Sequence, residues 1–134
     1  MLNTFPELLN YAMLGPTLLR LVLAFTLITI GIDTIRNKRA LFVAYFAGKE
    51  YPMANILPWK FAIVEIILGV FFLFGFFTQI TALISVYVLF SLFYIENRAE
   101  RILPHTSFFY VVMIVIALSL LLTGAGAFAV DLPL

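Results

Sequence analysis

The sequence predicts an all-α integral membrane protein built as a bundle of four transmembrane helices. The first observation behind this prediction is composition: 64% of the 134 residues are hydrophobic, 11% are charged and the mean hydropathy is +1.13. Soluble domains are about half apolar, so this chain has too few polar residues to cover a water-exposed surface. The second observation is that its few charges separate apolar stretches long enough to cross a bilayer.

The composition also excludes several classes of function. The formal net charge is +1, and no run of basic residues is available to hold nucleic acid. The absence of cysteine excludes disulfides, thiolate metal sites and iron–sulfur clusters. His105 is the only histidine, which argues against a haem held by two histidines of one chain. We therefore expect neither a bound metal nor an intrinsic cofactor.

The charges divide the chain into four spans. Read as one helix, the uncharged stretch 66–95 would be about 45 Å long, whereas a span needs about 20 residues to cross about 30 Å of hydrocarbon. The polar patch 78–81, which follows Gly75, therefore predicts a tight turn between two spans; one long tilted helix is the alternative. Gly124 and Gly126 are suited to ending the last span. The predicted spans are 17–35, 58–77, 80–95 and 106–123.

Basic residues favour four spans over three. Five of them lie between the first predicted span and the first turn of the second: Arg36, Lys38, Arg39, Lys49 and Lys60. Two more, Arg98 and Arg101, lie between the third and fourth spans. Only an even number of spans places both loops on one side, and lysine and arginine collect in cytoplasmic loops. Both termini are then expected outside the cytoplasm.

The first residues have the pattern of a short interfacial helix. They lack the basic start and the long apolar core of a signal peptide, so we expect the mature chain to keep them. Thr4 and Glu7 have the spacing of a capping box. Phe5, Leu8 and Leu9 would share one face of a helix lying on the membrane surface.

Glu65 is the first candidate for a functional residue because it lies inside the second span, about 10 Å from Pro58. An ionisable side chain in hydrocarbon costs a few kcal/mol and so requires a partner, water or a function. Gly69 and Phe72 follow Glu65 on the same helix face. Two interpretations stay open: a proton-carrying or ligand-binding carboxyl, or a protonated tie between helices. Phe72 and Thr29 are the other candidates for contact with a bound cofactor.

Arg20 is the second candidate catalytic residue and lies in the first turns of the first span. Its long side chain could reach the outer interface as an anchor. Ala24 and Gly31 share its face, which favours packing against another helix. Asp131 lies just beyond the fourth span on the same outer side. The sequence therefore predicts a structural ion pair between Arg20 and Asp131.

Thr29 and Asp33 form a second polar stripe, on nearly the opposite face of the first span. Both are predicted to lie near the depth of Glu65. Threonine hydroxyls often bond to the backbone of their own helix, and Asp33 has Arg36 as an alternative partner. This stripe therefore leaves a structural role open beside a ligand-binding one.

Three blocks of sequence carry a resemblance to a known family. They are LLRL at 18–21 leading to Gly31, EIILG at 65–69 followed by FGFFT at 74–78, and GAGAFAVD at 124–131. In their order and spacing they resemble the DoxX-like family of small four-helix membrane proteins. That family commonly has a basic residue soon after the glycine that ends the first span, whereas here Asp33 precedes Arg36.

The resemblance implies that the chain works beside quinone-linked enzymes, because the family takes its name from quinone-linked sulfur oxidation. It implies an accessory or quinone-interacting subunit of a membrane oxidoreductase, in the cytoplasmic membrane of a bacterium or archaeon. No intrinsic cofactor is expected, and quinone is the one cofactor that the resemblance allows. The alternative is a non-catalytic scaffold or assembly protein with no redox role. In either case the expected partners are the lipid bilayer and other membrane subunits or further copies of the chain.

Overall fold

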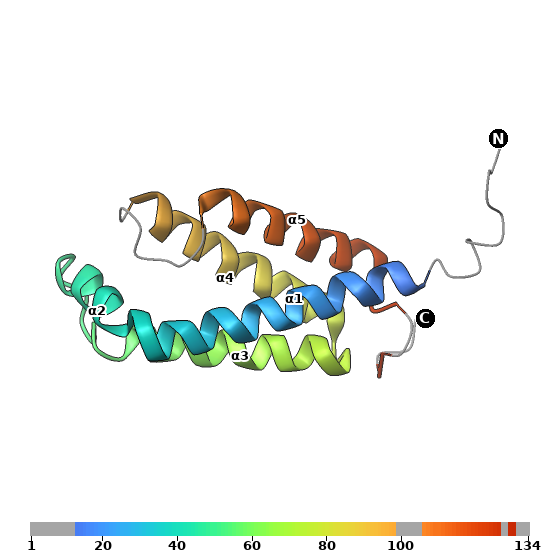
Figure 1. Cartoon of the computed structure of the whole chain (residues 1–134), viewed down its shortest axis with the longest axis horizontal. Helices are drawn as coiled ribbons and strands as arrows, with labels where there is room; N and C mark the ends of the chain where they lie inside the picture. Colours follow the sequence, from blue (N-terminus) through green and yellow to red (C-terminus); the bar gives the residue numbers. More distant parts are fainter. Residues whose placement is uncertain (1–12, 99–105, 127–128, 131–134) are drawn as a thin grey trace.

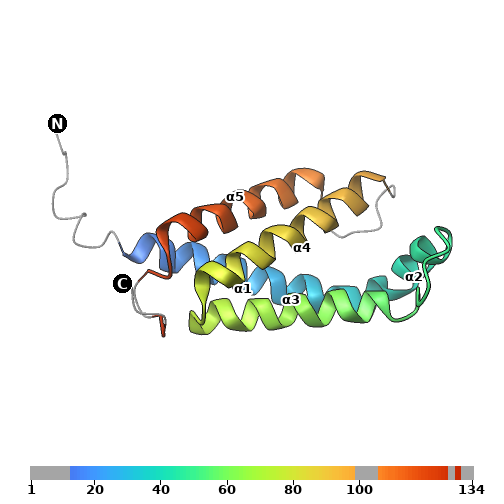
Figure 2. The same ribbon diagram turned by 180° about the vertical axis from the view of Figure 1, so that it is seen from behind.

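The computed structural model describes residues 13–98, 106–126 and 129–130. They form α1 (Leu14–Asp33), the π-helix η2 (Thr34–Lys38), α2 (Arg39–Ala47), α3 (Leu57–Phe74), α4 (Thr78–Arg98) and α5 (Ser107–Thr123). Helix α1 packs mainly on α3, and α4 packs mainly on α5 (Figures 1 and 2). The prediction of a four-helix membrane bundle is confirmed. The predicted interfacial helix at the start of the chain lies outside the described residues.

The helices are long and apolar enough to cross a membrane. Three helical stretches qualify by length and composition, namely Leu14–Ala47, Leu57–Phe74 and Thr78–Arg98. The apolar helix α5 has 17 residues, or about 26 Å at 1.5 Å per residue, close to the thickness of the hydrocarbon core. Its surface carries large exposed apolar side chains such as Phe108 and Leu122. A surface of this kind is suited to lipid and not to water.

The first helix continues beyond the predicted end at residue 35. Its α-helical part ends at Asp33, the π-helical turn η2 follows, and α2 extends the helix to Ala47. Helix α2 bends away from the axis of α1 (Figures 1 and 2). Short π-helical segments inside longer helices frequently occur at functional sites, and this one carries the first basic residues of the loop.

The hairpin between α3 and α4 turns at residues 75–77, before the polar patch expected to form the turn. Gly75 has a φ of 66°, which favours glycine. The amide of Phe76 donates to the carbonyl oxygen of Phe71, so that α3 ends in a Schellman motif. The threonines of the patch instead begin α4, where the Thr81 hydroxyl donates to the carbonyl oxygen of Phe76. Because the turn takes only residues 75–77, all four residues of the polar patch 78–81 belong to α4.

Two glycines allow α1 and α3 to pack closely. A Cβ atom at Gly31 would lie 2.8 Å from the carbonyl oxygen of Ala62, and one at Gly69 would lie 2.8 Å from that of Ala24. Real Cβ atoms do not approach other atoms so closely, so only glycine fits at either position. Small residues of this kind are the usual means by which membrane helices approach. This seam fixes the rotation of α3 and directs Glu65 into the bundle.

Candidate functional site

Glu65 lies in the interior of the bundle with none of its surface exposed. Its backbone position is opposite Gly31 of α1, where an added Cβ would come within 3.4 Å of the Glu65 Cβ. Neither carboxyl oxygen has a hydrogen-bond partner among the residues that the structure describes. Buried polar groups are nearly always satisfied, so this unsatisfied carboxyl in an apolar bundle makes Glu65 a candidate functional residue.

Tyr110 of α5 is a buried polar residue that the sequence interpretation missed. It is fully buried, and its hydroxyl lies within electrostatic range of the carboxyl groups of Glu65, Glu96 and Asp33. These four residues come from α3, α5, α4 and α1, so all four helices contribute to one polar region. A buried tyrosine normally needs a partner for its hydroxyl, and this requirement is the signal by which the sequence could have singled out Tyr110.

Ser85 is a further polar residue in the core, on α4. It has no exposed surface, and its hydroxyl has no hydrogen-bond partner within the described part of the chain. Serines in membrane helices commonly donate to the carbonyl four residues earlier, as Ser91 does to Tyr87. Ser85 does not make this bond, which leaves its hydroxyl free to donate to another molecule.

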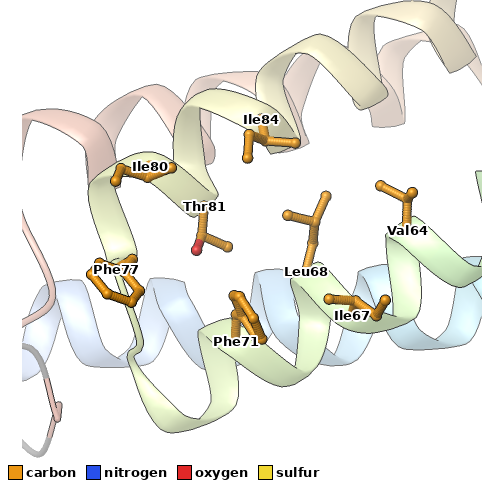
Figure 3. A pocket seen from close by; sticks show the side chains of 8 residues that line it. All are labelled: Val64, Ile67, Leu68, Phe71, Phe77, Ile80, Thr81 and Ile84. Atoms are coloured by element: carbon orange, nitrogen blue, oxygen red, sulfur yellow. The ribbon is translucent and has the colours of Figure 1, made fainter.

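An apolar groove separates α3 from α4 (Figure 3). Its volume is about 380 Å³. It is lined from α3 by Val64, Ile67, Leu68 and Phe71, and from the turn and α4 by Phe77, Ile80, Thr81 and Ile84. The only polar side chain among them, Thr81, donates to the carbonyl oxygen of Phe76, so the groove offers apolar contact alone.

The groove and the buried polar residues are adjacent along both helices. Leu68 lines the groove and follows Glu65 by one helical turn on the buried side of α3. On α4, Ile84 lines the groove and Ser85 comes next in the chain. Leu68 is buried and Ile84 is exposed, so of these two groove residues Leu68 is the one on the interior side.

Arg20 lies at the other end of the bundle from the basic loop. It is 2% exposed, and its guanidinium donates a 2.8 Å hydrogen bond to the carbonyl oxygen of Ala125. A Cβ at Gly75 would lie 2.5 Å from its Nη1 atom, so Arg20 also packs against the end of α3. The described structure therefore uses Arg20 to join three segments, far from Glu65. Its predicted partner Asp131 lies outside the described residues.

The remaining candidates occupy different environments. Thr29 is exposed on the outer side of α1, and its hydroxyl donates to the carbonyl oxygens of Phe25 and Thr26, so the structure does not bring it to Glu65. The reason is that the Gly31 face of α1, and not the Thr29 face, packs on α3. Phe72 is buried in the core on the face of α3 that Glu65 occupies.

Asp33 is half-buried at the end of α1. Its Oδ1 atom accepts a hydrogen bond from the Asn37 side chain, in place of the ion pair with Arg36 that the sequence left open. No group of three or more acidic or histidine residues that could hold a metal occurs within residues 13–98 and the other described positions.

Comparison with known proteins places this arrangement in a family. No curated protein and no solved structure matches the chain. A family model described as DoxX matches residues 15–97, which run from the start of α1 almost to the end of α4 and include Glu65 and Ser85. Tyr110 lies beyond the matched part. Because the match covers more than half of the chain and the helices are those of a membrane bundle, the protein is an integral membrane protein of the DoxX family.

Proposed function

We propose that this protein is a quinone-interacting component of a membrane oxidoreductase assembly and that Glu65 is the residue that contacts the quinone headgroup. The observation that carries the proposal is the Glu65 carboxyl, which is fully buried and has no hydrogen-bond partner in the described structure. A protonated carboxyl donates one hydrogen bond and can give up that proton. A quinone carbonyl oxygen can accept the hydrogen bond and, when the quinone is reduced, the proton.

The surrounding residues fit a quinone headgroup. The Ser85 hydroxyl is a second buried donor for a carbonyl oxygen, and the Tyr110 hydroxyl lies within electrostatic range of Glu65. Reduction of a quinone to a quinol consumes two electrons and two protons. Glu65 can supply one of the two protons; the other proton and both electrons come from the partner subunits of the assembly, because the chain has no cysteine and only one histidine to hold a redox centre.

The groove between α3 and α4 supplies a route from the bilayer. A membrane quinone carries an apolar tail, and every side chain that lines the groove presents apolar atoms to it. A rotamer change at Leu68, which lines the groove one helical turn from Glu65, would widen the groove towards the Glu65 carboxyl, and side-chain rotations of this kind are fast. The tail would then stay among Phe71, Phe77 and lipid while the headgroup reaches the polar residues.

A scaffold function is the second candidate, and the seam between α1 and α3 favours it. Glu65 lies directly against Gly31, so its placement could serve close packing alone. An interhelical tie, however, needs a donor or acceptor on the facing helix. The described residues provide none to the Glu65 oxygens, which supports the quinone proposal over the scaffold.

Two substitutions at Glu65 test the proposal. Glu65→Gln keeps the size of the side chain and its hydrogen-bonding ability but cannot exchange a proton. The assembly containing this variant should form normally and lose quinone reduction, measured with the natural donor. Glu65→Leu should also lose copurified quinone, without the loss of about 1 kcal/mol that breaking an interhelical hydrogen bond would cause.

Glu50→Gln is the matched control, because Glu50 is an exposed loop residue and the chemical change is the same. It should retain quinone content and turnover. Full turnover and unchanged quinone content in Glu65→Gln would remove the quinone role and leave the scaffold function in its place.

A further inference from the structure

A second groove, lined by polar and basic residues, lies where η2 and α2 meet the loop that leads to α3. Its volume is about 660 Å³. Its polar lining comes from the side chains of Arg36, Asn37, Arg39 and Asn55. Ile35 and Val43 form an apolar wall. It is at the opposite end of the bundle from Arg20, and the quinone proposal uses none of its residues.

The two arginines of this groove lack acidic partners. Arg36 and Arg39 are both exposed, and neither forms an ion pair with another residue that the structure describes. The nearest carboxyl along the chain, Asp33, accepts the amide of Asn37. The guanidinium of Arg39 lies 5.6 Å from the centre of the Trp59 ring, a cation–π contact that helps to hold it in place. The groove therefore presents two positive charges and two side-chain amides.

The depth of the groove in the bundle matches the headgroup region of a bilayer. It begins where the apolar helix α1 gives way to the basic turn η2. The half-exposed Trp59 lies beside it, and tryptophan is enriched at the boundary between hydrocarbon and headgroups. Lys49, whose ammonium lies over the Tyr45 ring, adds a further cation at this end. A ligand in the groove would thus have its charged part among headgroups and its apolar part beside Ile35 and Val43.

We propose that this groove binds the phosphate of an anionic phospholipid from the adjoining leaflet. Guanidinium groups match phosphate oxygens in bidentate geometry, and the amides of Asn37 and Asn55 can donate to the same oxygens. The apolar wall lies beside an acyl chain, which a free phosphate ion does not have. Basic pockets at the cytoplasmic ends of membrane helices are known places for such headgroups.

The single tryptophan of the chain makes the proposal measurable. The full chain is reconstituted in phosphatidylcholine vesicles that contain a fraction of phosphatidylglycerol, with bromine on the acyl chains of one lipid at a time. Bromine quenches tryptophan at close range, and Trp59 is the only tryptophan. Brominated phosphatidylglycerol should quench Trp59 at a several-fold lower mole fraction than brominated phosphatidylcholine.

Substitutions in the groove test whether its arginines cause the preference for anionic lipid. Arg36→Gln and Arg39→Gln should each reduce the ratio of the two quenching midpoints by up to about fivefold, since one basic residue near an anionic surface contributes about that factor. Arg98→Gln is the control: it removes a cation from α4 that lies over Tyr94 and does not line the groove. Each ratio is taken within one variant, so a direct effect of Arg39 on Trp59 emission cancels.

Three results would overturn the proposal. Equal quenching by the two lipids in the unmodified chain would show that the groove does not select anionic lipid. If Arg98→Gln lost the preference for anionic lipid as much as the groove variants do, the preference would come from the net charge of the protein and not from the groove. Removal of the preference by millimolar inorganic phosphate at constant ionic strength would identify a free anion as the ligand instead of the lipid.

Discussion

The guanidinium of Arg20 donates a 2.8 Å hydrogen bond to the carbonyl oxygen of Ala125, which lies 105 residues later in the chain. This bond joins the first turns of α1 to the segment that follows α5. The same segment reaches α3, because the amide of Val130 donates to the carbonyl oxygen of Phe74. This end of the bundle is therefore held by two hydrogen bonds between the helices and described residues that follow α5.

Replacing Arg20 should destabilise the bundle. Arg20→Leu removes a charge-assisted hydrogen bond and leaves the Ala125 carbonyl oxygen without that donor, which should cost about 1.5–3 kcal/mol. Thermal unfolding of the purified chain in detergent measures the loss. Arg36→Gln, at an exposed arginine, should leave the unfolding temperature nearly unchanged. Equal melting of the Arg20→Leu variant and the unmodified chain would show that the Ala125 bond adds nothing to stability.

Gly75→Ala should be strongly destabilising for two reasons. The residue has a φ of 66°, where an alanine costs about 1–2 kcal/mol, and its Cβ would meet both Arg20 and Ala129. Gly15→Ala is the matched control because nothing lies within 4 Å of an added Cβ there. Comparing the two unfolding temperatures gives the result. Equal unfolding temperatures for the two variants would show that the end of α3 has room for a Cβ atom at residue 75.

The seam between α1 and α3 predicts that Gly31→Ala and Gly69→Ala each cost about 1–3 kcal/mol, the usual penalty of overpacking. Each added methyl would meet a carbonyl oxygen at 2.8 Å. Chemical unfolding in mixed micelles measures the change, again with Gly15→Ala as the control. A neutral Gly31→Ala would show that the helices can separate without penalty, and Glu65 would then be less tightly confined.

An ion pair between Arg20 and Asp131 stays a prediction of the sequence. Reversing both charges should partly restore the stability that either single reversal loses. A double-mutant cycle of unfolding free energies measures the coupling, and a coupling energy within about 0.5 kcal/mol of zero would argue against a direct pair.

Orientation in the membrane is tested by cysteine labelling, which needs no background substitutions because the chain has no cysteine. Ala40 and Val130 are both exposed and lie at opposite ends of the bundle. The basic loop predicts that Ala40→Cys reacts from the cytoplasm and that Val130→Cys reacts with an impermeant reagent from outside. Labelling of both from one side would contradict the four-span topology.

The sequence by itself determined the number of membrane helices and the most conspicuous buried group. About 20 helical residues cross the hydrocarbon of a bilayer, so the sequence of the stretch 66–95 favoured two spans over one long tilted helix. A carboxyl inside a span is costly wherever the helix faces, so Glu65 could be recognised without knowing its neighbours. Arg36 and Arg39, which line the second groove, could also be recognised as members of the basic loop between the first two spans.

Only the tertiary structure decided which face of each helix is buried. These helices are apolar on all sides, with exposed residues such as Phe25 and Leu83 as apolar as the core, so periodicity alone could not say that the Gly31 face packs inward and the Thr29 face outward. Helix rotation follows from contacts between residues distant in the chain, such as Gly31 with Ala62 and Arg20 with Ala125. The same contacts bring Tyr110 to Glu65, because the rotation of each helix in lipid is set by packing against its neighbours.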